Sequence, residues 1–187
     1  MEVQSTPLRD CLVITPNIFP DERGFFIESW RRDIFSKELG LDLDFVQDNH
    51  SRSGRNVLRG LHFQWQPGLG KLMRVTRGRA FLVAVDIRLN SPTFGQWFGL
   101  EVSEDSKQMV WAPAGFARGF CALADITDIQ YKCTGLYNKE CESGILWNDP
   151  ALGIKWPVSD PTTSDKDRTA QTLAEWKERP EAANFKY

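Results

Sequence analysis

A succession of short, strand-like segments constrains the fold of this chain more than any other feature. Between residues 11 and 147 apolar runs alternate with turns, and the most apolar run, Ala80 to Ile87, is expected to be buried on both faces. Turn residues around 66–70 and 91–93 separate neighbouring runs. Short strands at regular spacing with little helix predict an all-β sandwich or barrel.

Helical signals are confined to two short segments. Residues 31–39 form a candidate helix that Gly40 ends, and residues 169–177 form a C-terminal candidate with Leu173 and Trp176 on one face. No repeat or linker divides the 187 residues, and this length suffices for one hydrophobic core. We therefore predict a single domain spanning 1–187.

The charge balance and the apolar content argue against several classes of partner. Lys and Arg number 23 against 25 Asp and Glu, so no basic face for long nucleic acids is implied. No run approaches the roughly 20 apolar residues of a membrane span, and the N-terminal residues lack the features of a signal peptide. Four separated cysteines without a C-x-x-C pair indicate reduced thiols in a cytoplasmic protein and no zinc site.

The segment 57–64 carries the residues most suited to chemistry. It has the composition of a strand, and Gly60 allows another group to approach the backbone closely. Arg59 is a permanent cation, and His62, one of two histidines, exchanges protons near neutral pH. His62 is therefore either a general base or a half-buried ring satisfied by a backbone carbonyl. Two histidines without an H-x-H spacing do not predict a multi-histidine metal site.

Eight short blocks of sequence occur in an order that is typical of one enzyme family. They are Asp21-Glu22-Arg23-Gly24-Phe25-Phe26, Phe45-Val46-Gln47-Asp48-Asn49-His50-Ser51, Val57-Leu58-Arg59-Gly60-Leu61-His62-Phe63-Gln64, Gly70-Lys71-Leu72, Val83-Ala84-Val85-Asp86, Ser91-Pro92-Thr93-Phe94-Gly95, Trp147-Asn148-Asp149-Pro150 and Lys166-Asp167. From about Cys11 to Asp167 the chain resembles the dTDP-4-dehydrorhamnose 3,5-epimerases, the RmlC-type cupin enzymes of rhamnose synthesis. The resemblance implies a double-stranded β-helix (cupin jelly roll) barrel with short helices. It also implies a homodimer with a shared active site and no metal or organic cofactor.

The implied substrate, a dTDP-linked 4-keto-6-deoxyhexose, defines the groups that catalysis needs. Its C–H bonds at C3 and C5 flank the carbonyl, so inversion requires a base on one face and an acid on the other. A cation or donor must also hold the enolate oxygen. Taken alone, a lysine and a strand tyrosine would be interpreted as a solvated charge and an ordinary aromatic. The resemblance assigns His62 as base, Asp167 as the carboxylate that orients it, Tyr131 as acid and Lys71 as the residue at the C4 oxygen.

The resemblance also implies a set of substrate-binding residues. Arginine forks suit a pyrophosphate, and Tyr137 matches an aromatic that stacks on thymine. Arg23 and Glu28 are expected to reach the site from the neighbouring subunit, although in isolation they would be interpreted as a surface ion pair. The expected set is Arg23, Glu28, Gln47, Asp48, Asn49, Arg59, Lys71, Arg118, Tyr137, Glu142 and Lys166.

Two positions depart from the family's pattern. Arg118 stands where the family's Gly-Phe-Ala-His-Gly-Phe segment has the histidine that lines the sugar site. Leu82 replaces an acid in the strand that usually reads Asp-Val-Ala-Val-Asp, although it also has a simple interpretation as strand packing. The altered pocket charge indicates a different ketosugar or a different number of inverted centres.

The main prediction is epimerisation at C3 and C5, which converts dTDP-4-dehydro-6-deoxyglucose into dTDP-4-dehydrorhamnose. Three alternatives stay open. One is epimerisation at C3 alone, and a second is a non-catalytic cupin that binds a nucleotide sugar. The third is a ketoisomerase that moves the carbonyl between C3 and C4.

Overall fold

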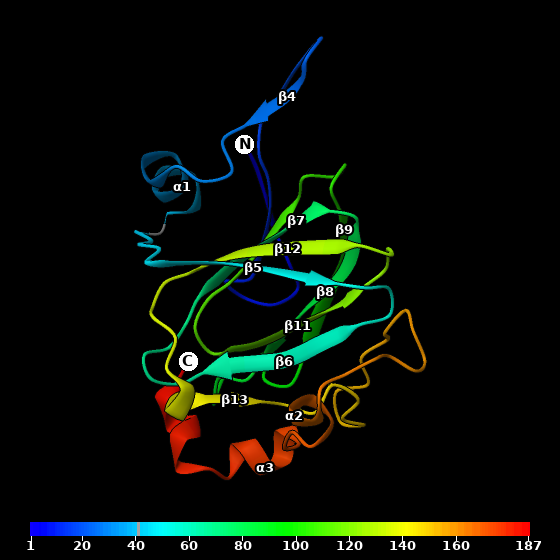
Figure 1. The fold of residues 1–187 in the computed structure, drawn as a ribbon. Helices are drawn as coiled ribbons and strands as arrows, with labels where there is room; N and C mark the ends of the chain where they lie inside the picture. The colour runs from blue at the N-terminus through cyan, green and yellow to red at the C-terminus, as the bar shows by residue number, and fades with distance from the viewer. Residues whose placement is uncertain (41) are drawn as a thin grey trace.

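Two antiparallel sheets face each other and enclose the hydrophobic interior of the molecule (Figure 1). The computed structural model describes residues 1–40 and 42–187, and within them thirteen strands form two large sheets and one hairpin. The six-stranded sheet has the order β1 (Glu2–Ser5), β2 (Leu12–Thr15), β10 (Met109–Ala112), β7 (Lys71–Arg77), β12 (Thr127–Cys133) and β5 (Gln47–Ser53). The five-stranded sheet has the order β13 (Glu142–Gly144), β6 (Leu58–Gln64), β11 (Phe116–Ala122), β8 (Arg79–Asp86) and β9 (Trp97–Ser103).

A two-stranded hairpin projects from the barrel and short helices flank it. The hairpin pairs β3 (Ile18–Asp21) with β4 (Gly24–Ile27) and extends away from both sheets in Figure 1. The expected helix at 31–39 is confirmed, and it ends at Gly40 with a φ of 65°. The helices are α1 (Arg32–Leu39), α2 (Asp165–Arg168) and α3 (Leu173–Lys177), with 3-10 turns η1 (Lys139–Cys141) and η2 (Pro180–Asn184).

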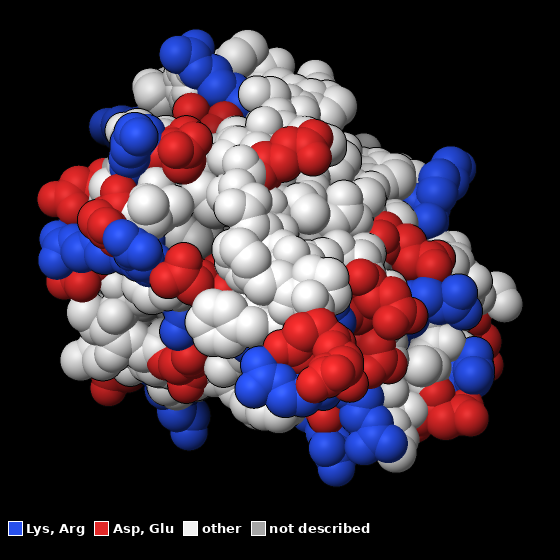
Figure 2. Space-filling model, turned by 90° about the horizontal axis from the view of Figure 1, so that it is seen from above, with Lys and Arg blue, Asp and Glu red and all other residues white. Residues whose placement is uncertain are grey.

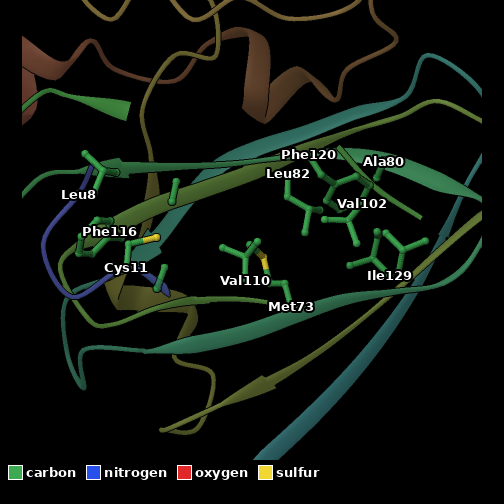
Figure 3. Packing of buried hydrophobic residues seen from close by; sticks show 13 residues of the cluster. Leu8, Cys11, Met73, Ala80, Leu82, Val102, Val110, Phe116, Phe120 and Ile129 are labelled. Carbon is green, nitrogen blue, oxygen red and sulfur yellow. The ribbon is translucent and has the colours of Figure 1, made fainter. Parts of the chain in front are cut away.

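Strand β8 is buried on both faces, as its apolar sequence predicts. Leu82 and Ala84 lie in the cluster inside the barrel, and Figure 3 shows Leu82 beside Phe120. Val83 points to the other side, into a second cluster that includes Trp176 of α3, which is fully buried. The expected apolar face of the C-terminal helix therefore covers the outer surface of the five-stranded sheet.

Gly60 is required by a close approach between β6 and β11. Its φ is +129°, and a Cβ at this position would lie 2.6 Å from the Cα of Gly119. Any larger residue would force the two strands apart. The expectation that another group approaches the backbone here is confirmed, and the contact fixes the strand that carries His62.

Some element boundaries differ from the sequence-based prediction. Strand β5 continues through the polar residues up to Ser53, because its backbone pairs in register with β12. The C-terminal helix α3 begins at Leu173 rather than at residue 169, because Thr172 caps its first turn. Strand β1 was not anticipated in the polar N-terminal segment, and it pairs with β2.

The surface carries mixed charges. Figure 2 shows Lys and Arg interspersed with Asp and Glu around an uncharged band on the face that it displays. Within residues 1–40 and 42–187, no helix is long and apolar enough to cross a membrane.

Candidate active site

A cavity of about 260 Å³ opens between the two sheets, and six of the predicted site residues line it. The five-stranded sheet contributes side chains from β6, β11 and β13, and the six-stranded sheet contributes side chains from β7 and β12. A ligand in this cavity is therefore approached from opposite sides by groups of different strands. The six residues are Arg59, His62, Lys71, Arg118, Tyr131 and Glu142.

His62 and Asp167 form the strongest polar pair of the site. The ring Nε2 of His62 lies 2.6 Å from Oδ1 of Asp167, although 105 residues separate them. Ser164 caps α2 and holds the Asp167 backbone, and the Asp167 side chain is only 4% exposed. Burial raises the pKa of Asp167, but the hydrogen bond and charge of His62 outweigh burial and leave this pKa below its ordinary value. The pair keeps a carboxylate behind the imidazole and leaves Nδ1 to accept a proton.

Tyr131 and Lys71 face the histidine from the other sheet. The Nζ of Lys71 lies 4.9 Å from the centre of the Tyr131 ring. Burial raises the pKa of Tyr131, so this phenol stays protonated at neutral pH. Burial and the charge of Arg118 lower the pKa of Lys71 to about 8. The site thus holds a proton donor and a cation of reduced basicity opposite an imidazole.

A second polar cluster lies at the edge of the cavity. Glu142 accepts hydrogen bonds from Lys166 Nζ at 2.6 Å and from the Tyr137 hydroxyl at 2.9 Å. Gln47 Oε1 accepts from the backbone N–H of Tyr137 at 2.9 Å, and its amide donates to Asn49 at 3.0 Å. Five predicted binding residues are therefore joined by hydrogen bonds beside the catalytic candidates.

Three predicted binding residues lie outside both the cavity and the cluster at its edge. Asp48 follows Gln47 in β5, so its side chain lies on the opposite face of the strand. Its carboxylate pairs with Lys132 Nζ at 2.7 Å. Arg23, whose side chain is 84% exposed, pairs with Asp21 at the tip of the hairpin. Glu28 follows the hairpin and pairs with Arg31. Within one chain, these three residues do not meet the other site residues.

Some cavity residues were missed from the sequence. Ser51, Met73, Phe120 and Ile129 line the cavity beside the catalytic candidates. The strand alternation in β5 was a usable signal, because residues 47, 49 and 51 share one face of the strand. The apolar residues that line the cavity could not be predicted in this way, because their sequence pattern is the same as that of any buried strand residue.

No set of ligands for a metal ion was found in the part of the chain that the structure describes. No group of three or more His, Cys, Asp or Glu side chains converges there.

Comparisons with known proteins agree on one family. The family model described as dTDP-4-dehydrorhamnose 3,5-epimerase matches residues 5–175. The enzyme of that name from Escherichia coli K12 is 50% identical over 177 residues, which cover 94% of this chain and 96% of that protein. A dTDP-4-dehydrorhamnose 3-epimerase from Streptomyces niveus is 39% identical, covering 87% of this chain and 79% of that protein.

Solved structures place the same fold around a bound nucleotide sugar. The dTDP-6-deoxy-D-glucose-3,5-epimerase of Legionella pneumophila, in complex with dTDP-4-keto-L-rhamnose, is 46% identical and superposes with a TM-score of 0.90. The match covers 92% of this chain and 93% of that one. The sequence, the cupin-like jelly roll and the cavity between its sheets together assign this chain to the dTDP-4-dehydrorhamnose 3,5-epimerase family.

Proposed function

We propose that this protein inverts C3 and C5 of dTDP-4-dehydro-6-deoxyglucose to give dTDP-4-dehydrorhamnose, with His62 as base and Tyr131 as acid. The observation that carries this assignment is the placement of the two groups on facing sheets. His62 belongs to β6 and Tyr131 to β12, and both line the same cavity. Inversion needs proton removal on one face of the sugar and delivery on the other, and this arrangement supplies both.

The first half of the reaction breaks a C–H bond next to the carbonyl. His62 takes the proton on Nδ1 while Nε2 donates to Asp167, whose negative charge stabilises the imidazolium that forms. The electron pair of the C–H bond moves toward the C4 oxygen, where Lys71 stabilises the developing charge. The result is an enolate, or an enol if the oxygen is protonated.

The second half forms a C–H bond on the opposite face. The enolate electrons return to the carbon, which takes the proton of the Tyr131 hydroxyl, and the C4 carbonyl is restored. Proton exchange with solvent then regenerates neutral His62 and protonated Tyr131. The same pair acts at C3 and at C5, because both carbons flank one carbonyl.

The edge cluster of the cavity suits the nucleotide. Tyr137 is 54% exposed, and its hydroxyl is held by Glu142, so its ring is fixed and open for stacking on a planar base. Arg59 lines the cavity, and its Nε donates a hydrogen bond to Ser53 Oγ at 3.1 Å. This bond holds a permanent cation where it can bind the pyrophosphate. Lys166 adds a second cation beside Glu142.

We expect a homodimer whose hairpins complete the site of the partner. Phe19, Phe25 and Phe26 on the hairpin are 54%, 56% and 64% exposed. Neighbouring exposed aromatics of this kind mark an interaction surface. Arg23 lies at the hairpin tip and Glu28 directly follows it, so a second copy packed on the hairpin would receive both side chains.

Subunit mixing tests the shared site. Arg23→Ala and His62→Asn variants should each be inactive alone, whereas a mixture of the two should recover part of the activity through hybrid dimers with one intact site. Two copies of the His62→Asn variant with different tags form the matched control and should recover none. A monomeric protein in solution, or a mixture without recovery, would contradict the shared site.

Isotope exchange tests the reaction itself. Turnover in heavy water should place deuterium at both C3 and C5 of the dTDP-sugar, as followed by NMR. His62→Gln should abolish the exchange while dTDP binding is retained, because the substitution removes the base and leaves the nucleotide contacts. Label at neither carbon would refute the assignment.

The other outcomes separate the alternatives. Label at C3 alone would identify a 3-epimerase, an alternative favoured by Arg118 and Leu82, which depart from the family's pattern, and by the 3-epimerase among the relatives. Binding of dTDP without exchange would identify a non-catalytic cupin. A carbonyl moved to C3 would identify a ketoisomerase.

The expected surroundings of the enzyme follow from its surface and thiols. Cys11, Cys121, Cys133 and Cys141 are free, which suits a reducing cytoplasm. The absence of nucleic-acid and membrane partners remains an expectation from composition.

A further inference from the structure

Arg118 is a buried cation that the mechanism above does not use. It lines the cavity, yet only 4% of the residue is exposed. Its Nη2 donates to the backbone carbonyls of Leu69 and Pro113, the second at 3.1 Å, while Nε and Nη1 are buried without a hydrogen-bond partner in the structure. Buried guanidinium groups ordinarily pair with a carboxylate.

No carboxylate compensates this charge within residues 1–40 and 42–187. The acidic groups that act on Arg118 are the thiols of Cys133 and Cys11, which are protonated at neutral pH because burial raises the pKa of both. Leu82 lies diagonally across from Arg118 in the register of β8 and β11 and presents an aliphatic side chain to the interior. The positive charge of Arg118 therefore acts on the cavity without a neutralising neighbour.

The charge of Arg118 acts on Lys71. This lysine projects from β7 into the same cavity, where its side chain is half-buried. Burial is the largest cause of the lowered pKa of Lys71, and the charge of Arg118 is the second. The charged and titratable groups that line the cavity with Lys71 or act on it through their charge are Arg59, Arg118, Cys133, Tyr131, Glu142, Lys166 and His62.

We propose, on the basis of the function proposed above, that Arg118 is a positioning residue whose unpaired charge makes Lys71 a proton donor to the C4 oxygen. As His62 removes the C3 or C5 proton, the carbonyl π bond opens and the C4 oxygen takes a proton from the Lys71 ammonium. The intermediate is then a neutral enol beside a neutral amine. When Tyr131 protonates the carbon, the enol O–H returns its proton to the amine, and all atoms and charges balance.

The pH profile of kcat/KM tests this role. With a Lys71 pKa of about 8, activity should fall about tenfold between pH 7 and pH 9, because only the ammonium donates a proton. Arg118→Met should reduce that fall to less than about twofold, since removal of a like charge raises the Lys71 pKa. Arg118→Lys keeps the charge and should keep the tenfold fall.

A second set of variants keeps Arg118 and tests the same proposal if Arg118→Met fails to fold. Leu82→Asp should offset the charge and reduce the alkaline fall, whereas the neutral control Leu82→Asn should not. Lys71→Arg should leave little activity at any pH, because a guanidinium keeps its proton and does not transfer it to the C4 oxygen. An active enzyme whose alkaline fall is the same in the wild type, Arg118→Met and Leu82→Asp would overturn the proposal. A wild type without any epimerisation would instead refute the underlying function.

Discussion

Two clusters of buried charge on this barrel are built in opposite ways. In the Arg88 clamp, formed by Asp10, Asp86, Arg88, Ser91 and Thr93, the Asp86 carboxylate accepts from Arg88 Nε and Nη2, each at 2.9 Å, and from two hydroxyls at 2.6 Å. In the cavity, Arg118 and Lys71 share one sign of charge, and Arg118 has no carboxylate partner among the described residues. The polar groups of the clamp bind each other, whereas the Arg118 and Lys71 cations of the cavity have no such partner among the described residues and can act on a substrate.

The difference separates stability from activity. A satisfied cluster holds the backbone at the end of β8, and its loss should lower the unfolding free energy. An unsatisfied cluster costs stability, and its retention is explained by the chemistry that it performs. Substitutions in the two clusters should therefore affect different measurements.

The largest effect is expected from Asp167→Asn in the cavity. Asparagine keeps the shape but removes the charge that stabilises the His62 imidazolium, so kcat should fall on the order of 100-fold or more. The unfolding free energy should change far less than kcat does. Stopped assays with urea unfolding on the same samples would measure both, and an unchanged kcat would contradict the role of Asp167.

The next effect is expected from Arg88→Met in the clamp. This change leaves Asp86 buried without its counter-ion, because that side chain is fully buried, and should lower the unfolding free energy by about 3–5 kcal/mol. Arg118→Met is the matched control and should stay within about 1 kcal/mol, since it also removes an uncompensated buried charge. Equal destabilisation by the two substitutions would erase the distinction between the clusters.

A smaller effect concerns acid pH. Burial raises the pKa of Asp86, but hydrogen bonds from Arg88, Ser91 and Thr93 outweigh burial and depress it. A depressed folded-state pKa contributes stability above the unfolded value of about 4, and this contribution is lost as pH falls below it. Urea unfolding between pH 5 and pH 3 should show this loss, and Asp86→Asn should flatten the slope. A steeper slope in the variant would contradict the assignment.

The smallest effect is expected from Asp48→Asn. Asp48 pairs with Lys132 on the side of β5 away from the cavity, and half-exposed pairs contribute less than about 1 kcal/mol. The KM for the dTDP-sugar should also stay unchanged, as steady-state kinetics would show. A KM raised severalfold would restore Asp48 to the substrate-binding set.

The sequence pattern predicted most strands of the barrel, but it did not predict the contacts between residues that are far apart in the sequence. The apolar run of β8 and the Leu173 and Trp176 face were evident from periodicity, because buried strands and amphipathic helices follow local rules. The contact between His62 and Asp167 was not, since 105 residues separate them and only the family resemblance suggested it.

The alternation of side chains along β5 also predicts which of its residues face the cavity. Gln47, Asn49 and Ser51 share one face of β5, so the same pattern that implicates Asn49 also implicates Ser51 and disfavours Asp48. The state of Arg118 could not be predicted in this way. Arg118 has no carboxylate partner among the described residues, and the side chains around it come from other segments of the chain. No local sequence pattern predicts which side chains will surround a residue in the folded protein.

The stereochemical course of a Tyr131→Phe variant in heavy water tests the facing-sheet mechanism most directly. The account predicts that His62 still removes the proton, so deuterium enters each carbon that the wild type inverts, but with configuration retained because the opposite face has lost its donor. Inversion at those carbons at the wild-type rate would contradict it.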